Sequence, residues 1–490
     1  MLKSHVTYSN AFNMFFVIGF IYLLFNLGTS YLFVDKLQIV TIYILNLAPI
    51  IYYLKFEDKE ELLPLFQMIL IYIFIAYTLT FFFRNLEFYL FYFPSQSDWL
   101  TEEKIPILRS TRNILLIALL SLNLGYFFFL KFFTKKRQGF DSMLFKKNNT
   151  IVITGFLSFA AYILIFIILK LQNFIPGIGQ MNYPLMYISF IMILTGALKN
   201  KNNIFINCLG VIFFCFIIYY NISLGIYGAP FKLITILFIL FIFLKKRVPI
   251  FSIIIVVILF LFAHSIKYDI RESIISQGSS LDRKTTLTAI IKNKFFNKAT
   301  EKKSRIELIK NNQLELRRTL LRVVHSYKSL LIINNEHHFI KTKTPSPYLN
   351  GSTYRILLTR LIPRIFWKDK PSDELGNSLG KYYSVLTQND FGTSWNMPVI
   401  NESYSNFGLK GVIVIMFLLG AISRYLSFNF FISKTYNVEF IISFTLILPL
   451  WYMESHLSQL IGGIIQQYLL LCIVFFLYLR VLKLLNSQSK

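Results

Sequence analysis

The sequence is poor in charged residues, in cysteine and in nucleotide-binding motifs, and each shortage argues against a class of protein. Only 15% of its 490 residues are charged and 55% are hydrophobic, which is more apolar surface than a soluble domain of this length can bury. Its three cysteines lie inside apolar runs, so they indicate no disulfide framework and leave the redox compartment open. The sequence contains no P-loop, GxGxxG or Ser-His-Asp signature.

Basic residues outnumber acidic ones by 50 to 24, and this excess first suggests a nucleic-acid partner. Most of these Lys and Arg residues, however, stand at the ends of apolar runs, as in the cluster at 245–247. At such positions they anchor helices against anionic lipid headgroups. The pattern therefore indicates a lipid bilayer as the partner, and no nucleic acid.

Uncharged apolar runs recur along almost the whole chain and predict transmembrane helices. Residues 151–169, for example, hold no charged side chain and are long enough to cross the hydrocarbon layer of a bilayer as a helix. Buried helices of a large soluble protein are the alternative, which the repetition of the pattern disfavours. We expect about twelve spans. They are centred near Ile21, Tyr43, Ile73, Leu122, Phe159, Ile191, Phe213, Ile236, Val257, Met416, Leu446 and Leu471.

The distribution of basic residues between the apolar runs predicts the topology. If the basic loop 131–147 is cytoplasmic, the basic connections near 199–201 and 245–247 fall on the same side, and both termini are cytoplasmic. No small-residue cleavage site follows the first apolar run, so it is expected to remain as a span. The predicted fold is an all-α, polytopic bundle. Nine spans lie in residues 1–265, one large outer loop occupies 266–410, and three spans follow in 411–490.

The outer loop contains one clear helix signal. Ser304 and Glu307 have the spacing of a capping box, in which each side chain bonds a backbone amide at the start of a helix. Apolar residues then recur at helical spacing from Leu316 to Leu331. An amphipathic helix of about 25 residues is expected here, lying on the membrane or on the bundle.

The end of the outer loop, residues 345–411, differs in composition from the rest of the chain. It is dense in Arg, Lys, Tyr, Trp, Asn, Gly and Pro. Aromatic faces stack on sugar rings and cationic side chains hold phosphate oxygens, so this mixture suits a phosphorylated glycan. Three motifs stand out: Pro-Tyr-Leu-Asn-Gly at 347–351, Ile-Pro-Arg-Ile-Phe-Trp-Lys-Asp-Lys-Pro at 362–371, and Met-Pro at 397–398 followed by Asn-Glu-Ser-Tyr-Ser-Asn-Phe-Gly at 401–408.

With these motifs the sequence resembles the Wzy-type O-antigen and exopolysaccharide repeat-unit polymerases. The resemblance implies a bundle similar to the polyprenyl-dependent (GT-C-like) glycosyltransferases and the O-antigen ligases. It implies a multi-pass glycosyltransferase of the bacterial plasma (inner) membrane, which joins undecaprenyl-pyrophosphate-linked oligosaccharides at the outer face. A flippase and a chain-length regulator are the expected protein partners. The chemistry requires no cofactor or metal if cationic side chains neutralise the leaving group.

The resemblance also suggests which residues hold the leaving pyrophosphate. Arg360 and Arg364 are four residues apart and would share one face if a helix continued through Pro363. Three further basic residues could do the same work: Arg355, Lys368 and Lys370. Alternatively, these side chains only hold lipid headgroups at the interface, beside Trp367.

Glu402 is the expected general base. It stands at the start of a span, where partial desolvation would make its carboxylate a better acceptor for the proton of the attacking hydroxyl. The alternative is a structural glutamate that caps a helix or forms an ion pair. Tyr404 and Asn406, in the same motif, are expected to contact substrate.

Ionisable residues elsewhere provide weaker candidates. Glu454 and His456 lie at the predicted outer end of a span and could complete the site or replace Glu402 as base. His325 lies on the expected amphipathic helix, and an outer-loop histidine is associated with O-antigen ligases, so the ligase remains an alternative function. The adjacent His337 and His338 are expected in a solvated loop, with no metal bound.

A flippase or other transporter of lipid-linked oligosaccharides is the rival function of a different class. Transport of this kind needs charged residues at mid-depth in the spans and ordinarily short external loops. Almost all the predicted spans lack charge at mid-depth, and the outer loop is the most polar part of the chain. The sequence therefore favours surface chemistry over transport.

Overall fold

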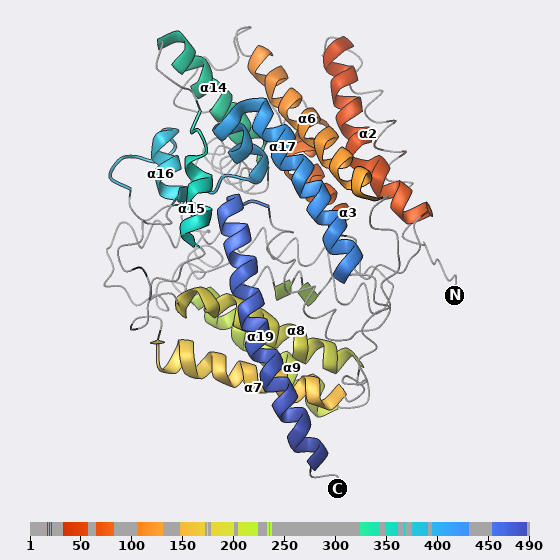
Figure 1. Cartoon of the computed structure of the whole chain (residues 1–490), viewed down its shortest axis with the longest axis vertical. Coiled ribbons are helices and arrows are strands. Elements are labelled where there is room, and N and C mark those ends of the chain that lie inside the picture. The colour runs from red at the N-terminus through yellow and green to blue at the C-terminus, as the bar shows by residue number, and fades with distance from the viewer. Residues whose placement is uncertain are drawn as a thin grey trace, which may run out of the picture. The chain divides into compact units, whose positions relative to one another are not determined.

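The computed structural model is helical wherever it describes regular structure (Figure 1). The described residues, apart from a few single positions, are 33–56, 65–82, 105–130, 148–171, 178–199, 204–223, 324–342, 348–360, 375–390, 394–430 and 453–487. They divide into two compact units. Unit 1 comprises Met1–Ser142 and Val323–Tyr468, and unit 2 comprises Met143–Arg322 and Leu469–Lys490.

Unit 1 contains the helices on which the candidate site is built. Its first half holds α2 (Phe33–Phe56), α3 (Leu65–Ile73), the π-helical turn η1 (Phe74–Thr78), α4 (Leu79–Phe82) and α6 (Ile105–Leu130). Its second half holds α14 (Ser326–Thr342), α15 (Ser352–Arg360), α16 (Leu375–Tyr382), α17 (Val399–Phe430) and the start of α19 (Leu457–Ser487).

Helices α2 and α6 lie side by side and run parallel (Figure 1). Near the middle of the pair, Asn123 donates a hydrogen bond from Nδ2 to the carbonyl of Leu45 at 3.0 Å. Further along, the Tyr52 ring packs edge-on against Phe127, with ring centroids 6.3 Å apart. The contacts advance in the same direction along both helices. Two parallel neighbours require a return segment between them, and α3 and α4 lie between them in the chain.

Helix α17 packs along α6 at very close range, because each helix has a glycine at the contact. A Cβ atom on Gly125 would lie 2.0 Å from the carbonyl oxygen of Phe417, and one on Gly420 would lie 2.1 Å from that of Leu122. Any side chain at either position would therefore push the two backbones apart. Small residues that allow such an approach are typical of helix contacts within membranes.

The close approach at Gly420 predicts that a larger residue there destabilises the protein. Replacing Gly420 by Ala should destabilise unit 1 by about 1–3 kcal/mol, because the added methyl group overpacks a backbone contact. Thermal unfolding of the purified full-length protein in detergent would measure the loss. Gly210→Ala is the control, since the nearest atom to its new Cβ would be Ile193 Cγ2 at 3.7 Å. If both substitutions left the melting temperature unchanged, the α6–α17 contact would not exist as described.

Four helices of the described chain are long and apolar enough to cross a membrane. They are Val34–Tyr53, Ile107–Phe129, Ile151–Ile168 and Val399–Ser427. Large apolar side chains are exposed on their surfaces, among them Leu124 on α6 (62%) and Val414 on α17 (55%), as expected for helices whose outer faces contact lipid. Shorter apolar helices occur at Leu65–Phe81, Asn182–Gly196, Cys208–Asn221 and Leu470–Val481. The count of twelve spans and the large outer loop stay predictions, since much of the relevant sequence lies outside the described residues.

Unit 2 contains α7 (Asn148–Tyr162), the π-helical η4 (Ile163–Ile168), the short 3₁₀ helix η6 (Ile178–Met181), α8 (Asn182–Lys199), α9 (Ile204–Ser223) and the second part of α19. Helices α7 and α8 also meet at small residues: a Cβ on Gly196 would lie 2.1 Å from Cγ2 of Val152. Between α7 and α9, Phe159 packs edge-on against Phe213, with ring centroids 3.8 Å apart. The described part of this unit is thus a second apolar helical group.

Two local expectations from the sequence are wrong. The amphipathic helix predicted to run to Leu331 does not continue through Val324 and His325, which are not helical, and α14 begins only at Ser326. The amide of His325 donates to the carbonyl of Ala76 at 2.6 Å, a contact between distant segments in place of a helical one. His337 and His338 lie within α14 and not in a loop. The part of the expected helix before Val324 lies outside the described residues.

Candidate functional site

The candidate site surrounds the first segment of α17, which is separated from the rest of the helix by a break. Phe407 and Gly408 have non-helical backbone angles, with φ of −141° and +62° respectively. A Cβ on Gly408 would lie 2.9 Å from the hydroxyl oxygen of Tyr348, so both the positive φ and the close neighbour require glycine. The short segment before the break, 399–406, can therefore point its polar side chains independently of the long apolar segment after it.

Asn401 joins this segment to two distant parts of unit 1. Its Oδ1 accepts a hydrogen bond from the hydroxyl of Tyr77, and its Nδ2 donates to Oγ of Ser329 at 2.8 Å. Tyr77 lies in the π-helical turn η1, and such turns occur frequently at functional sites. Ser329 lies on α14. The amide of Asn401 thus holds η1, α14 and α17 together.

Asn406 makes the corresponding connection to α15. Its Nδ2 donates to the carbonyl of Glu402, one helical turn earlier, and to Oγ1 of Thr353, both at 2.8 Å. Because a carbonyl oxygen can only accept, this pairing also fixes which end of the amide is nitrogen. The Oδ1 atom of Asn406 is buried and has no hydrogen-bond partner within the described part of the chain.

Glu402 is the central residue of the cluster and is fully buried. Its Oε2 accepts a hydrogen bond from the backbone amide of Leu457 at 2.6 Å, which places the carboxylate at the N-terminal end of α19. The other oxygen, Oε1, is buried and meets no donor at hydrogen-bond geometry among the described residues, although Thr353 interacts with the same carboxyl group. One oxygen is therefore bound at the start of a helix, as the capping alternative expects, and a catalytic role for the other stays a prediction.

The structure brings three further candidates of the sequence analysis to the same region. Glu454 and His456, both buried, directly precede α19, whose first amide binds Glu402. His325 is also buried, and its ring centroid lies 6.3 Å from that of Tyr77. Glu454 in turn interacts electrostatically with the Tyr77 phenol. Titratable side chains from four separate stretches of sequence thus gather around one helix segment.

Tyr404 binds a second carboxylate of this region, that of Glu336. Its hydroxyl donates to Oε2 of Glu336 at 2.6 Å, and the hydroxyl of Tyr348 donates to Oε1 at 2.7 Å. Burial raises the pKa of Tyr348 to about 12, and its hydrogen bond to Glu336 adds to this rise. The phenol therefore remains protonated and continues to donate at neutral pH. The Glu336 carboxylate thus holds Tyr404 and Tyr348 in place. These two bonds connect α14 with α17 and with the loop that precedes α15.

The predicted pyrophosphate ligands are placed only in part. Arg355 lies on α15 with its side chain exposed, and Arg360 is the last residue of that helix. Trp367, described as a single position, is 37% exposed. Arg364, Lys368 and Lys370 lie outside the described residues, as does the helix continuation that would pair Arg360 with Arg364. Their shared role stays a prediction.

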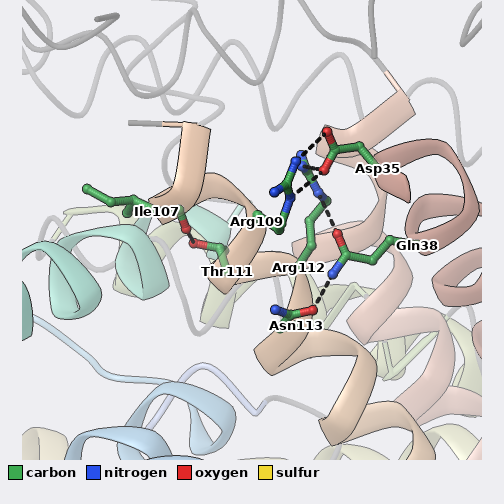
Figure 2. A network of polar contacts seen from close by, with 7 residues as sticks. All are labelled: Asp35, Gln38, Ile107, Arg109, Thr111, Arg112 and Asn113. Atoms are coloured by element: carbon green, nitrogen blue, oxygen red, sulfur yellow. Dashed lines mark hydrogen bonds and ion pairs between the residues drawn. The ribbon is translucent and has the colours of Figure 1, made fainter. Parts of the chain in front are cut away.

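A separate polar cluster lies where α2 and α6 begin (Figure 2). Arg112 donates from Nη2 to Oδ1 of Asp35 at 2.8 Å, and Arg109 donates from Nε to the same oxygen at 3.0 Å. Gln38 accepts from Nε of Arg112 at 3.1 Å and donates to Asn113. Asp35 and Arg112 are both buried. None of these residues was singled out from the sequence, because isolated charges at span ends are common in helices that cross membranes.

Several residues of the main site also gave no signal in the sequence. Tyr77 lies within an apolar run, where a tyrosine is ordinary, and Ser329 and Thr353 are neutral residues in the predicted outer loop. Asn401 stood in a motif but had no assigned role. The contacts of these residues join segments far apart in the sequence, so spacing along the chain could not reveal them. Among the described residues no group of three or more His, Cys, Asp or Glu side chains could hold a metal ion.

Fold and site together define an all-helical protein with membrane-length apolar helices and a buried polar cluster at a helix break. The chain belongs to the family described as a domain of unknown function, DUF8712, which matches residues 22–487. No curated protein matches the chain, and no solved structure matches it.

Proposed function

We propose that this protein is a membrane glycosyltransferase that polymerises lipid-pyrophosphate-linked oligosaccharide repeat units, with Glu402 as its general base. One observation carries the proposal: the Glu402 carboxylate is fully buried, with one oxygen bound to Leu457 and the other without a hydrogen-bond partner in the described chain. A buried carboxylate whose position is fixed through one oxygen is suited to take a proton through the other.

The proposed reaction is a single displacement. A hydroxyl of the acceptor sugar loses its proton to Oε1 of Glu402 and attacks the anomeric carbon of the donor. The bond from that carbon to the pyrophosphate oxygen breaks, and polyprenyl pyrophosphate leaves with the bonding electrons. The protein has to position the two sugars and stabilise the departing charge. Arg360 and Arg364, with Arg355, Lys368 and Lys370 as alternatives, are proposed for the second task.

An O-antigen ligase is the second candidate, and the position of His325 favours it. This histidine lies in the same cluster, beside Tyr77 and directly before α14, where it could act as an acid or a base. Ligase and polymerase share the lipid-linked donor and the leaving group, and they differ in the acceptor. The cluster around Glu402 serves equally well for either acceptor, so a cellular product distinguishes them better than geometry.

The test is deletion of the gene in its own cell, followed by separation of surface and lipid-linked glycans by size. Loss of a polymerase should leave single repeat units at the surface, and the wild-type gene should restore the full range of chain lengths. Accumulation of long lipid-linked polymer would support the ligase instead. Absence of any exported unit would indicate a flippase, and an unchanged glycan profile would reject all three functions.

A further inference from the structure

Three buried polar atoms around Glu402 have no hydrogen-bond partner among the described residues. They are Oε1 of Glu402, Oδ1 of Asn406 and the hydroxyl of Tyr354. Glu402 and Asn406 are one turn apart on the first segment of α17, and Tyr354 follows Thr353, which binds Asn406. Leaving such atoms without partners is costly, so their concentration in one place points to a ligand.

The chemistry of these atoms restricts what the ligand can be. A carboxylate oxygen and an amide oxygen can only accept hydrogen bonds, so the ligand must present a donor to each of them. A phosphate group offers acceptor oxygens and negative charge, and the Glu402 carboxylate would repel it. Two neighbouring hydroxyls of a sugar ring meet the requirement.

Tyr354 adds a hydroxyl group near Glu402. Burial raises the pKa of its phenol far above the ordinary value, and the nearby Glu402 carboxylate adds to the rise. The hydroxyl therefore stays protonated and can donate to a sugar oxygen. Its ring stacks on Phe407, with centroids 6.0 Å apart and planes inclined by 24°. Phe407 is 45% exposed, so an aromatic surface suited to the C–H face of a sugar leads from the outside toward the buried atoms.

We infer that Glu402, Asn406 and Tyr354 form a subsite for a hydroxyl pair of the acceptor sugar, from which the pyrophosphate of the donor is excluded. This assignment rests on the proposed function for the identity of the sugar as an acceptor. It makes Tyr354 and Asn406 residues that position the acceptor, and it requires that the cations for the leaving group lie elsewhere in the protein.

Tyr354→Phe tests the subsite, because it removes only the hydroxyl. A buried hydroxyl without a partner contributes nothing to folding, so the melting temperature of the full-length protein in detergent should stay the same or rise. Binding of methyl glycosides, observed by saturation-transfer NMR, should weaken by about 3- to 10-fold, the value of one neutral hydrogen bond. Tyr383→Phe is the control, since it removes another buried phenol hydroxyl, which lies beside Trp395 and interacts with Ser405.

The probes also test the kind of ligand. Inorganic phosphate and ethanolamine should not displace the glycosides from the wild-type protein. Equal sugar binding by the wild type and Tyr354→Phe, no binding of any glycoside, or displacement by phosphate or ethanolamine would each overturn the inference. A melting temperature lowered by Tyr354→Phe would show a structural role instead. The gene-deletion phenotype does not depend on these measurements, so the subsite and the polymerase function can fail separately.

Discussion

Glu402→Gln should reduce the rate of glycan linkage by about 100-fold or more while leaving the protein folded, since a positioned general base contributes roughly 10²- to 10⁴-fold. The amide oxygen of glutamine can still accept the hydrogen bond from Leu457, so the cap of α19 is kept. What is lost is the second oxygen as a proton acceptor. The rate is measured as the formation of dimers from lipid-linked repeat units in membranes that contain the variant, with thermal unfolding as the check on folding.

Two other glutamates make this experiment specific. Glu336→Gln changes a nearby carboxylate that holds Tyr348 and Tyr404, and it should lower the rate far less than Glu402→Gln. Glu454→Gln tests another candidate for the base, which is buried close to Tyr77. If Glu454→Gln stopped linkage and Glu402→Gln did not, Glu454 would be the base and Glu402 only a cap.

The ionisable part of the site was predictable from the sequence because such residues are costly near apolar spans. Glu402, Glu454 and His456 each border a predicted span, whereas His325 was singled out through the resemblance to O-antigen ligases, and the structure brings all four into one region. Their chemical roles, by contrast, stay predictions. An ionisable residue near a span is expected to be functional, and only its contacts indicate its role.

The neutral part of the site was not predictable, for a physical reason. Asn401 bonds Ser329, 72 residues earlier in the chain, and Tyr77, 324 residues earlier. A sequence pattern reports neighbours along one helix or strand, whereas these bonds depend on how distant helices pack. The predicted helix through His325 failed for the same reason, because the amide of that residue bonds the distant carbonyl of Ala76.

The break in α17 shows a similar limit. The sequence predicted that spans follow the outer loop in residues 411–490, and a long apolar helix does follow Gly408. Nothing in the spacing showed that residues before Gly408 also form a helix, or that this helix carries the site. The positive φ of Gly408 and its contact with Tyr348 are properties of the folded chain.

Asp35→Ala should be the most destabilising of the substitutions considered, by about 3–5 kcal/mol, because it leaves the buried Arg112 guanidinium without its carboxylate. The positions of the charges explain the size of the effect. Asp35 lies in the first turn of α2, where a negative charge is favourable. Arg109 and Arg112 lie in the second and third turns of α6, beside this carboxylate (Figure 2). One carboxylate thus offsets both guanidinium groups.

A set of variants separates this explanation from a general sensitivity to substitution. Arg109→Ala should have a small effect, because its side chain is 38% exposed and water can solvate the remaining groups. Replacing both members of the buried pair, as in Asp35→Leu with Arg112→Met, should restore much of the stability lost in Asp35→Ala, since no unpaired charge stays buried. Thermal unfolding in detergent of the wild type, the single variants Asp35→Leu and Arg112→Met and the double variant gives the coupling between the two positions. If the double variant were as unstable as the sum of its single changes, the ion pair would not hold α2 to α6, and packing of the helices would have to do so alone.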